Sequence, residues 1–129
     1  MNGLYAVIAI SAGSVIGGLT RYGLSLGMNA IFPPIPMGTL VCNLIAGYIV
    51  GVAIAFFAAS PNLAPHWRLF IITGLAGGIS TFSTFSAELL ALLRAGSLSL
   101  AAGMLVLHLG GSLIMTALGM TTVSLTNHS

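Results

Sequence analysis

The sequence contains very little charge. Only 3% of its 129 residues are charged, three of them basic and one acidic, whereas a soluble domain carries about 25% charged residues. So few charged groups cannot cover a surface that faces water, and 57% of the residues are hydrophobic. The net charge of +2 is also too small to indicate nucleic-acid binding. The chain is therefore predicted to be an integral membrane protein whose main solvent is the lipid bilayer.

Cysteine is nearly absent as well. Cys42 is the only one, so the chain cannot form an intrachain disulfide, and a single cysteine does not make a metal site. Cys42 lies in an apolar stretch, where we expect it to pack. No nucleotide-binding motif and no Ser/His/Asp set is evident, so we predict that the protein is not an enzyme. The apolar run that starts at Leu4 is too long for a signal-peptide core, and no cleaved signal is expected.

Four long apolar runs dominate the sequence. A helix needs about 20 apolar residues to cross a hydrocarbon core of about 30 Å, and each run reaches that length. Turns rich in proline or glycine separate them. The runs are continuous rather than alternating, which disfavours a β-barrel. We predict an all-α fold with one transmembrane domain, residues 1–129, that is multi-pass in the inner (plasma) membrane. The expected helices cover about residues 3–28, 37–59, 66–94 and 98–125.

Pairs of glycines four residues apart occur in all the expected helices except the last. Such pairs allow two helix backbones to approach closely in lipid. Four helices are few for an enclosed pore, so we expect a symmetric dimer, the commonest oligomer. The pairs are Gly13/Gly17, Gly23/Gly27, Gly47/Gly51 and Gly74/Gly78.

The basic residues give almost no preferred orientation. Arg68 would lie on the same side of the membrane as the N-terminus, and Arg21 and Arg94 would lie toward the other side. The Lys/Arg bias that normally sets topology is therefore nearly balanced. One interpretation is that the chain inserts in both orientations and pairs antiparallel. The other is that a weak bias still selects one orientation.

The third apolar segment contains an expected break. Residues 66–94 would form a straight helix of about 43 Å, which is longer than the hydrocarbon core. Gly77 and Gly78 stand near its centre and are followed by several hydroxyl residues, and glycine is a poor helix former. A break here frees backbone carbonyls, which are tolerated inside a membrane only where protein, water or an ion satisfies them. The alternative is a glycine kink whose hydroxyls bond back to the helix.

An aromatic pair lies just after this expected break. Phe82 and Phe85 are three residues apart, so both face roughly the same way on a helix. They stand among serines and threonines, an unusual setting for lipid contact. Because ring edges carry partial positive charge, the pair could attract an anion. Packing in the core or against lipid is the alternative interpretation.

Other segments add polar groups at membrane depth. Asn43 lies within the second run, and its amide offers two donors. His108, Ser112 and Thr116 lie at successive positions of one helical face, which indicates either a wet track or hydrogen bonding between helices. We interpret His108 by itself as a hydrogen-bonded core residue.

Two charged residues within the apolar segments are functional candidates. Glu88 is the only acid, and ionisable residues in membrane segments often serve function. An ion pair with Arg94 or a solvated position at a pore mouth are the two simpler interpretations. Arg21 could extend to the interface, or it could line a cationic vestibule that concentrates anions.

Four stretches resemble motifs of the CrcB/Fluc family of fluoride channels, and together they cover nearly the whole chain. Residues 77–86, GGISTFSTFS, with Glu88 after them, are similar to the family's third-helix signature. Residues 17–22 (GGLTRY), 38–47 (GTLVCNLIAG) and 111–119 (GSLIMTALG) resemble motifs of the first, second and fourth helices. Any one stretch alone would be a weak signal, but the four together are specific.

The resemblance implies a fold and a function. It implies an antiparallel (dual-topology) homodimer with two narrow pores, which exports cytoplasmic fluoride passively, and a structural sodium ion on the two-fold axis. The backbone carbonyls of Gly77 and Ser80 are the implied sodium ligands. The family more often has threonine at the position of Ser80, but a carbonyl ligand does not depend on the side chain.

The same resemblance implies roles along the anion pathway. Phe82 and Phe85 correspond to the paired aromatics beside the pores, and Asn43 to the pore amide. Glu88 corresponds to a carboxylate near one pore mouth and Arg21 to a vestibule arginine. The implied polar track is Thr81, Ser83, Thr84, Ser112 and Thr116.

A small multidrug exporter is the main alternative, since it is also a four-helix, dual-topology dimer. That chemistry needs a carboxylate deep in the membrane. The first segment has no acid, and Glu88 lies near the end of the third. The sequence shows no catalytic set of the kind that a membrane enzyme needs. A purely structural role would leave the intramembrane polar groups unexplained.

Overall fold

The structure is a computed structural model that describes residues 3–127; residues 1, 2, 128 and 129 of the predicted domain lie outside the described part. Within residues 3–127 the chain is helical and has no strand. Helix α1 spans Gly3–Met28 and α2 spans Met37–Ala58. The remaining elements are α3 (Pro65–Arg68), the π-helical stretch η1 (Leu69–Ala76), α4 (Gly77–Ile79), α5 (Phe82–Arg94) and α6 (Leu98–Asn127).

Four spans of the described chain are long and apolar enough to cross a membrane. They are α1, α2, the composite third span Pro65–Arg94, and α6. Many large hydrophobic side chains along α1 and α6 are exposed in the single chain, as expected for surfaces that face lipid or another protein. The predicted all-α membrane fold with four spans and an interrupted third span is confirmed, and the chain is a multi-pass membrane protein.

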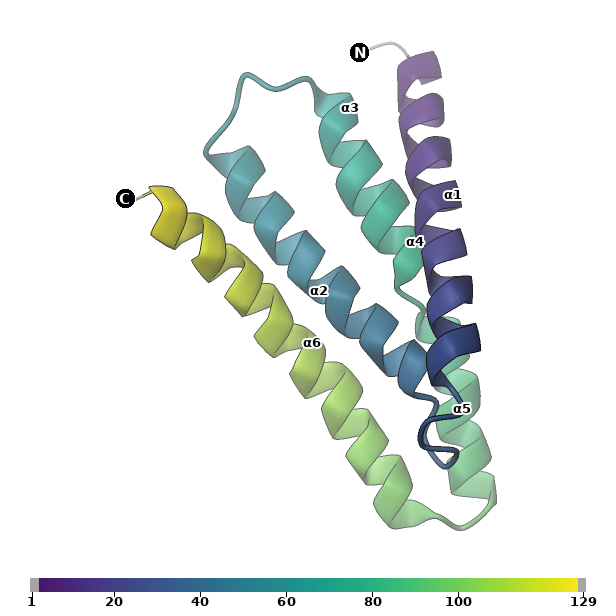
Figure 1. Cartoon of the computed structure of the whole chain (residues 1–129). Coiled ribbons are helices and arrows are strands. Elements are labelled where there is room, and N and C mark those ends of the chain that lie inside the picture. The colour runs from purple at the N-terminus through teal and green to yellow at the C-terminus, as the bar shows by residue number, and fades with distance from the viewer. Residues whose placement is uncertain (1–2, 128–129) are drawn as a thin grey trace.

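Both ends of the described chain lie at one end of the bundle, together with the connection between α2 and α3 (Figure 1). The α1–α2 and α5–α6 connections lie at the opposite end (Figure 1). Helix α1 packs along η1 and α4, while α6 packs along α2. Helix α2 thus lies between α6 and the first half of the third span, and its side chains can reach both.

Close packing uses three of the four predicted glycine pairs. A Cβ atom on Gly13 would lie 2.9 Å from the Cα of Gly74, and one on Gly17 would lie 3.0 Å from the Cα of Gly78. Two pairs therefore face each other where α1 meets the third span. Gly51 faces Gly119 of α6 in the same manner. The Gly23/Gly27 pair differs, because a Cβ on either residue would meet nothing within 4 Å.

The break in the third span begins at Ser80, after the two glycines. Gly77 is in the right-handed helical region, whereas Ser80 (φ −73°, ψ 153°) and Thr81 (φ −152°, ψ 110°) are extended. Gly78 lies against the backbone of α1, where a Cβ would meet Gly18 N and Ser14 O at 3.0 Å. The need for glycine at position 78 is thus close approach to α1 rather than an unusual backbone conformation.

A small core beside the break holds the elements in place. Cys42 and Ala46 of α2 pack against Ala76 and Ile79 of the third span, and all four are buried. Cys42 is fully buried. Small side chains here let α2 approach the interrupted helix, which positions the polar residues of α2 against residues 80 and 81.

Candidate functional site

Asn43 closes the break from the neighbouring helix. Its Oδ1 accepts a hydrogen bond from the backbone N–H of Thr81 at 2.7 Å, and its Nδ2 donates to the carbonyl of the same residue at 3.3 Å. In a continuous helix these two groups would bond within the helix itself. One amide side chain thus satisfies both polar groups of an extended residue at membrane depth, where an unpaired group is costly.

Arg21 reaches the break from the other side. Its Nε donates to the carbonyl of Gly78 at 3.0 Å, so α1 supplies a charged donor to a carbonyl that the break would leave unpaired. The sequence suggested either extension to the interface or a place in a vestibule. The hydrogen bond adds a structural task that neither interpretation included.

The carbonyls of Gly77 and Ser80, predicted as sodium ligands, have few partners within the chain. Among the described residues, the Gly77 carbonyl accepts only a long hydrogen bond of 3.5 Å from the Ser80 hydroxyl. Within residues 3–127 no donor is found for the Ser80 carbonyl. Hard cations prefer oxygen ligands. Two carbonyl oxygens that are three residues apart and accept no strong hydrogen bond in the described part fit such an ion. No cluster of His, Cys, Asp or Glu in the described part could hold a metal instead.

A cavity of ≈ 560 Å³ lies beside the break and collects most of the predicted pathway residues. Asn43 and Thr81 lie in its wall with the aromatic pair, and α6 contributes its polar face. Ser83, Thr84, Glu88 and Arg21 are not in this wall, so their predicted pathway roles stay predictions. The lining residues with polar or aromatic side chains are Asn43, Ser80, Thr81, Phe82, Phe85, His108, Ser112 and Thr116.

The two phenylalanines contact each other but differ in burial. Their ring centroids are 5.9 Å apart with planes tilted by 59°. Phe85 is 7% exposed, while Phe82 is 78% exposed in the single chain. Phe85 is therefore a core residue on one side and a cavity residue on the other. The Phe82 side chain projects from the single chain. It would lie either at the entrance of the cavity or under a second protein.

Helix α5 starts at this point for local reasons. Thr81 is its N-cap residue, and the Thr81 hydroxyl oxygen accepts from the backbone N–H of Thr84 at 3.2 Å. Ser83 lies within hydrogen-bond distance of the same hydroxyl at 3.4 Å. Of the predicted track hydroxyls, that of Thr81 therefore caps the helix and that of Ser83 contacts it, which leaves both with less capacity for an ion.

His108 is a cavity residue that the polar track implied by the resemblance did not include. Its Nδ1 lies 2.9 Å from Asn43 Nδ2, and its ring stacks on Phe85 with centroids 4.4 Å apart and an interplanar angle of 30°. The residue is 4% exposed. The signal in the sequence was its register with Ser112 and Thr116, which the structure places together in the cavity wall.

Glu88 pairs with a hydroxyl, and within residues 3–127 it has no ionic partner. Its Oε2 accepts from the Thr39 hydroxyl at 2.9 Å, and its Oε1 is buried with no hydrogen-bond partner in the described part. Thr39 is only 2% exposed, and no sequence pattern singled it out. The simple interpretation of an ion pair with Arg94 is not seen.

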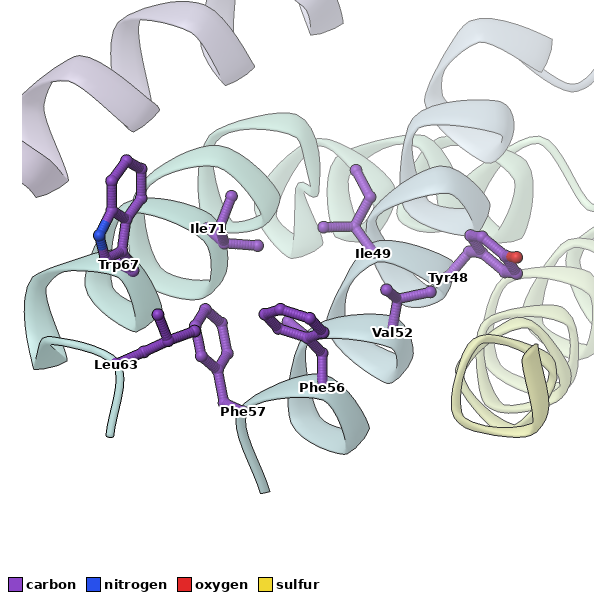
Figure 2. Close-up of a pocket in the computed structure, with 9 residues that line it drawn as sticks. Tyr48, Ile49, Val52, Phe56, Phe57, Leu63, Trp67 and Ile71 are labelled. Atoms are coloured by element: carbon purple, nitrogen blue, oxygen red, sulfur yellow. The ribbon is translucent and has the colours of Figure 1, made fainter. Parts of the chain in front are cut away.

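A second cavity of ≈ 480 Å³ lies between α2 and the start of the third span. Figure 2 shows that aromatic and aliphatic side chains surround it, among them Phe56, Phe57 and Trp67. The hydroxyl of Tyr48, at one edge, is within hydrogen-bond distance of the Thr122 hydroxyl, at 2.9 Å. A wall of this kind suits hydrocarbon and offers an anion no set of donors, so it is a poor candidate for an ion pathway.

Four apolar spans, an interrupted third helix and a cavity with polar walls at membrane depth define a multi-pass membrane protein with an intramembrane polar site. The chain belongs to the family described as "CrcB-like protein, Camphor Resistance (CrcB)", which matches residues 8–120. The sequence-based assignment to the CrcB/Fluc family is therefore confirmed.

Three relatives of the chain share the name "Fluoride-specific ion channel FluC". The one from Xanthomonas oryzae pv. oryzae (strain MAFF 311018) is 60% identical over 129 residues, which are 100% of this chain and 96% of that protein. The one from Tolumonas auensis is 55% identical over 126 residues, 98% of this chain and 99% of that protein. The one from Nitrosomonas europaea is 58% identical over 118 residues, 92% of this chain and 93% of that protein. These names describe ion channels rather than enzymes.

Proposed function

We propose that the protein is a passive, fluoride-selective anion channel that exports fluoride from the cytoplasm. The observation that carries the proposal is its 60% identity, over its whole length, to a relative named as a fluoride-specific ion channel. The cavity beside the break agrees in chemistry, because its wall combines aromatic rings with amide, imidazole and hydroxyl groups. A small multidrug exporter is not favoured, since the relatives compared above are named as fluoride channels and the only acid, Glu88, accepts a hydrogen bond from Thr39.

The proposed anion pathway follows the cavity wall. Phe82 and Phe85 would present ring edges to the ion, and the hydroxyls of Ser112 and Thr116 would continue the pathway along α6. Both Asn43 donors are engaged within the chain, so we assign Asn43 the task of holding the break and shaping the wall. Glu88, with Thr39, would lie toward one mouth, and Arg21 would attract anions at the vestibule.

The proposed functional unit is an antiparallel homodimer with two pores. Support comes from the outward exposure of Phe82 and from Gly77, where a Cβ would meet only Ile72 O, at 3.5 Å. A glycine that packing within the chain does not require is explained if another backbone approaches it in the assembly. The nearly balanced arginines support insertion in both orientations.

A sodium ion at the two-fold axis is the proposed cofactor, held by the carbonyls of Gly77 and Ser80 from each copy. When bound, it would supply positive charge that holds two broken helices together. The residues present fit this role, because within residues 3–127 both carbonyls lack strong partners.

Export of fluoride through such a channel requires no energy source. Neutral HF crosses lipid and dissociates in a less acidic cytoplasm, which traps fluoride there. An inside-negative potential favours exit of an anion by about 2.3 kcal/mol per 100 mV for each charge.

The test is fluoride efflux from liposomes reconstituted with the purified protein. We expect efflux that starts on addition of a potassium ionophore and is much slower with chloride as the only internal anion. Liposomes that release fluoride no faster than protein-free ones would contradict the proposal. Proton-coupled uptake of a cationic dye would support the exporter instead.

A further inference from the structure

His108 holds an unused hydrogen-bond donor inside the cavity wall. The Asn43 amide orientation is fixed, because its Oδ1 must accept from the N–H of Thr81. Its Nδ2, a donor, therefore faces His108 Nδ1 at 2.9 Å, so Nδ1 has to act as an acceptor. The ring hydrogen of the neutral imidazole must then be on Nε2.

This Nε2–H has no acceptor in the described part of the chain. The atom is buried and has no hydrogen-bond partner, although His108 lines the cavity together with Phe82, Phe85 and Ser112. A buried donor without an acceptor is destabilising, and such groups are rare in native proteins. The acceptor must therefore come from outside the single chain.

The surroundings of the ring select which acceptor could fit. Phe85 stacks on its face at 4.4 Å, and Asn43 holds the opposite nitrogen, so the ring has little freedom to move away. Nε2 is shielded from a water-sized probe. An acceptor can therefore reach this donor only after a slight tilt of the ring and only if it is about as small as a water molecule, a size that dehydrated fluoride has and chloride exceeds.

We propose that His108 Nε2–H donates a hydrogen bond to the permeating fluoride and helps to select it over larger halides. This inference rests on the proposed function and names a donor that the proposed anion pathway does not include. Fluoride is the smallest halide and the strongest hydrogen-bond acceptor among them. A shielded, preoriented donor beside an aromatic ring therefore favours fluoride over chloride.

Two substitutions separate the two ring nitrogens. Asparagine places its oxygen near the position of Nδ1, so His108→Asn keeps an acceptor for Asn43 and loses the Nε2 donor. Glutamine places its amide nitrogen near the position of Nε2, so His108→Gln keeps the donor and loses the acceptor. We expect fluoride efflux to fall by about tenfold or more in His108→Asn, since one hydrogen bond to a charged group is lost. His108→Gln should stay within about threefold of wild type.

His66 provides the matched control, because it lies at the start of the third span and is not in the cavity wall. His66→Asn and His66→Gln should leave efflux unchanged. Efflux at the wild-type level in folded His108→Asn would overturn the inference. A larger loss in His108→Gln than in His108→Asn would also overturn it, and would assign His108 only the task of holding Asn43. Wild-type protein that releases no fluoride would contradict the proposed function instead.

A measurement on the unsubstituted position 108 decides the matter if both variants misfold or are equally impaired. The measurement is NMR spectroscopy. Histidine that carries an NMR-active nitrogen isotope would be incorporated into a His66→Gln/His128→Gln background, which leaves His108 as the only histidine. We expect its Nε2–H resonance to shift when fluoride replaces gluconate and to stay in place when chloride does. A resonance that is unchanged by fluoride would overturn the inference.

Discussion

At the scale of single residues, the cavity wall depends on a connected set of side chains rather than on separate ion ligands. Asn43 bonds to the backbone of Thr81 and to His108, and His108 stacks on Phe85. Phe85 in turn contacts Phe82. A change at one of these positions will therefore disturb its neighbour, and effects at adjacent members will not add.

The aromatic pair can be tested by replacing each ring with an alkyl chain of similar bulk. In Phe82→Leu/Phe85→Leu we expect fluoride efflux to fall by about tenfold or more, since leucine lacks the positive ring edge. The packing loss should be modest, about 0.5–3 kcal/mol at Phe85, and smaller at exposed Phe82. Liposome efflux and size-exclusion chromatography are the measurements. Normal efflux from a folded double mutant would leave the aromatic site without support.

Asn43 can be tested with two substitutions that differ in charge. Asn43→Asp removes the donors that face the Thr81 carbonyl and His108 Nδ1 and adds a negative charge to the wall. Asn43→Ser keeps a small donor without the charge. We expect the aspartate variant to lose more fluoride efflux and more thermal stability than the serine variant. Equal loss in both would mean that the charge of the wall is unimportant for the anion.

At the scale of elements, the third span is a helix in two parts joined at residues 80 and 81. The first part packs on α1 through facing glycines, and the second part starts with its own cap at Thr81. The gap is bridged by side chains from other helices, Arg21 of α1 and Asn43 of α2. The break is thus supported on both sides and does not require a flexible hinge.

Gly77 and Gly78 form a matched pair for testing the sodium site. A Cβ on Gly78 would meet α1 backbone at 3.0 Å, while one on Gly77 would meet only Ile72 O at 3.5 Å. Gly78→Ala should therefore destabilise the single chain, by about 1–3 kcal/mol for an overpacked position. Gly77→Val should leave the chain folded and weaken dimer assembly or transport.

Ser80→Ala completes this test, because the proposed ligand is the carbonyl and not the hydroxyl. We expect efflux and dimer assembly within about twofold of wild type. The measurements are efflux in sodium and in a large organic cation, together with the monomer fraction on size-exclusion chromatography. A severe Ser80→Ala defect beside a harmless Gly77→Val would reverse the assignment.

At the scale of the whole molecule, the single chain exposes much apolar surface and has little charge to orient it. Arg68 lies at the end of the bundle that holds both termini, whereas Arg21 and Arg94 lie on elements that run toward the opposite end (Figure 1). The apolar cavity between α2 and the third span (Figure 2) lies toward the Arg68 end. Because the three arginines are divided between the two ends, charge gives almost no preference for one insertion orientation.

Dual insertion can be tested by adding charge at the two ends. Ile31→Arg/Arg68→Gln would concentrate positive charge at one end, and Asn62→Arg/Arg94→Gln would concentrate it at the other. Each variant alone should insert in one orientation and export little fluoride, and co-expression should restore export, because antiparallel partners are then available. Tag accessibility from both sides of the membrane is the measurement. Wild-type labelling confined to one side would contradict the antiparallel dimer.

The sequence by itself determined the class of the protein and where its third helix would be interrupted. Near-absence of charge and four long apolar runs leave lipid as the only suitable solvent. The adjacent Gly77 and Gly78, followed by hydroxyl residues, indicated a break near Gly77–Ser80. These features are local or compositional, so they can be read without knowing how the helices pack.

Only the tertiary structure decided how the polar groups are paired. Asn43 meets Thr81 across 38 positions and His108 across 65, and Thr39 meets Glu88 across 49. The register between packed helices sets such contacts, and it depends on where small residues such as Gly17, Gly78 and Ala46 let backbones approach. From the sequence, Asn43 was the predicted anion donor. Within the described residues, packing engages both of its amide donors, and the donor without a partner is instead Nε2–H of His108.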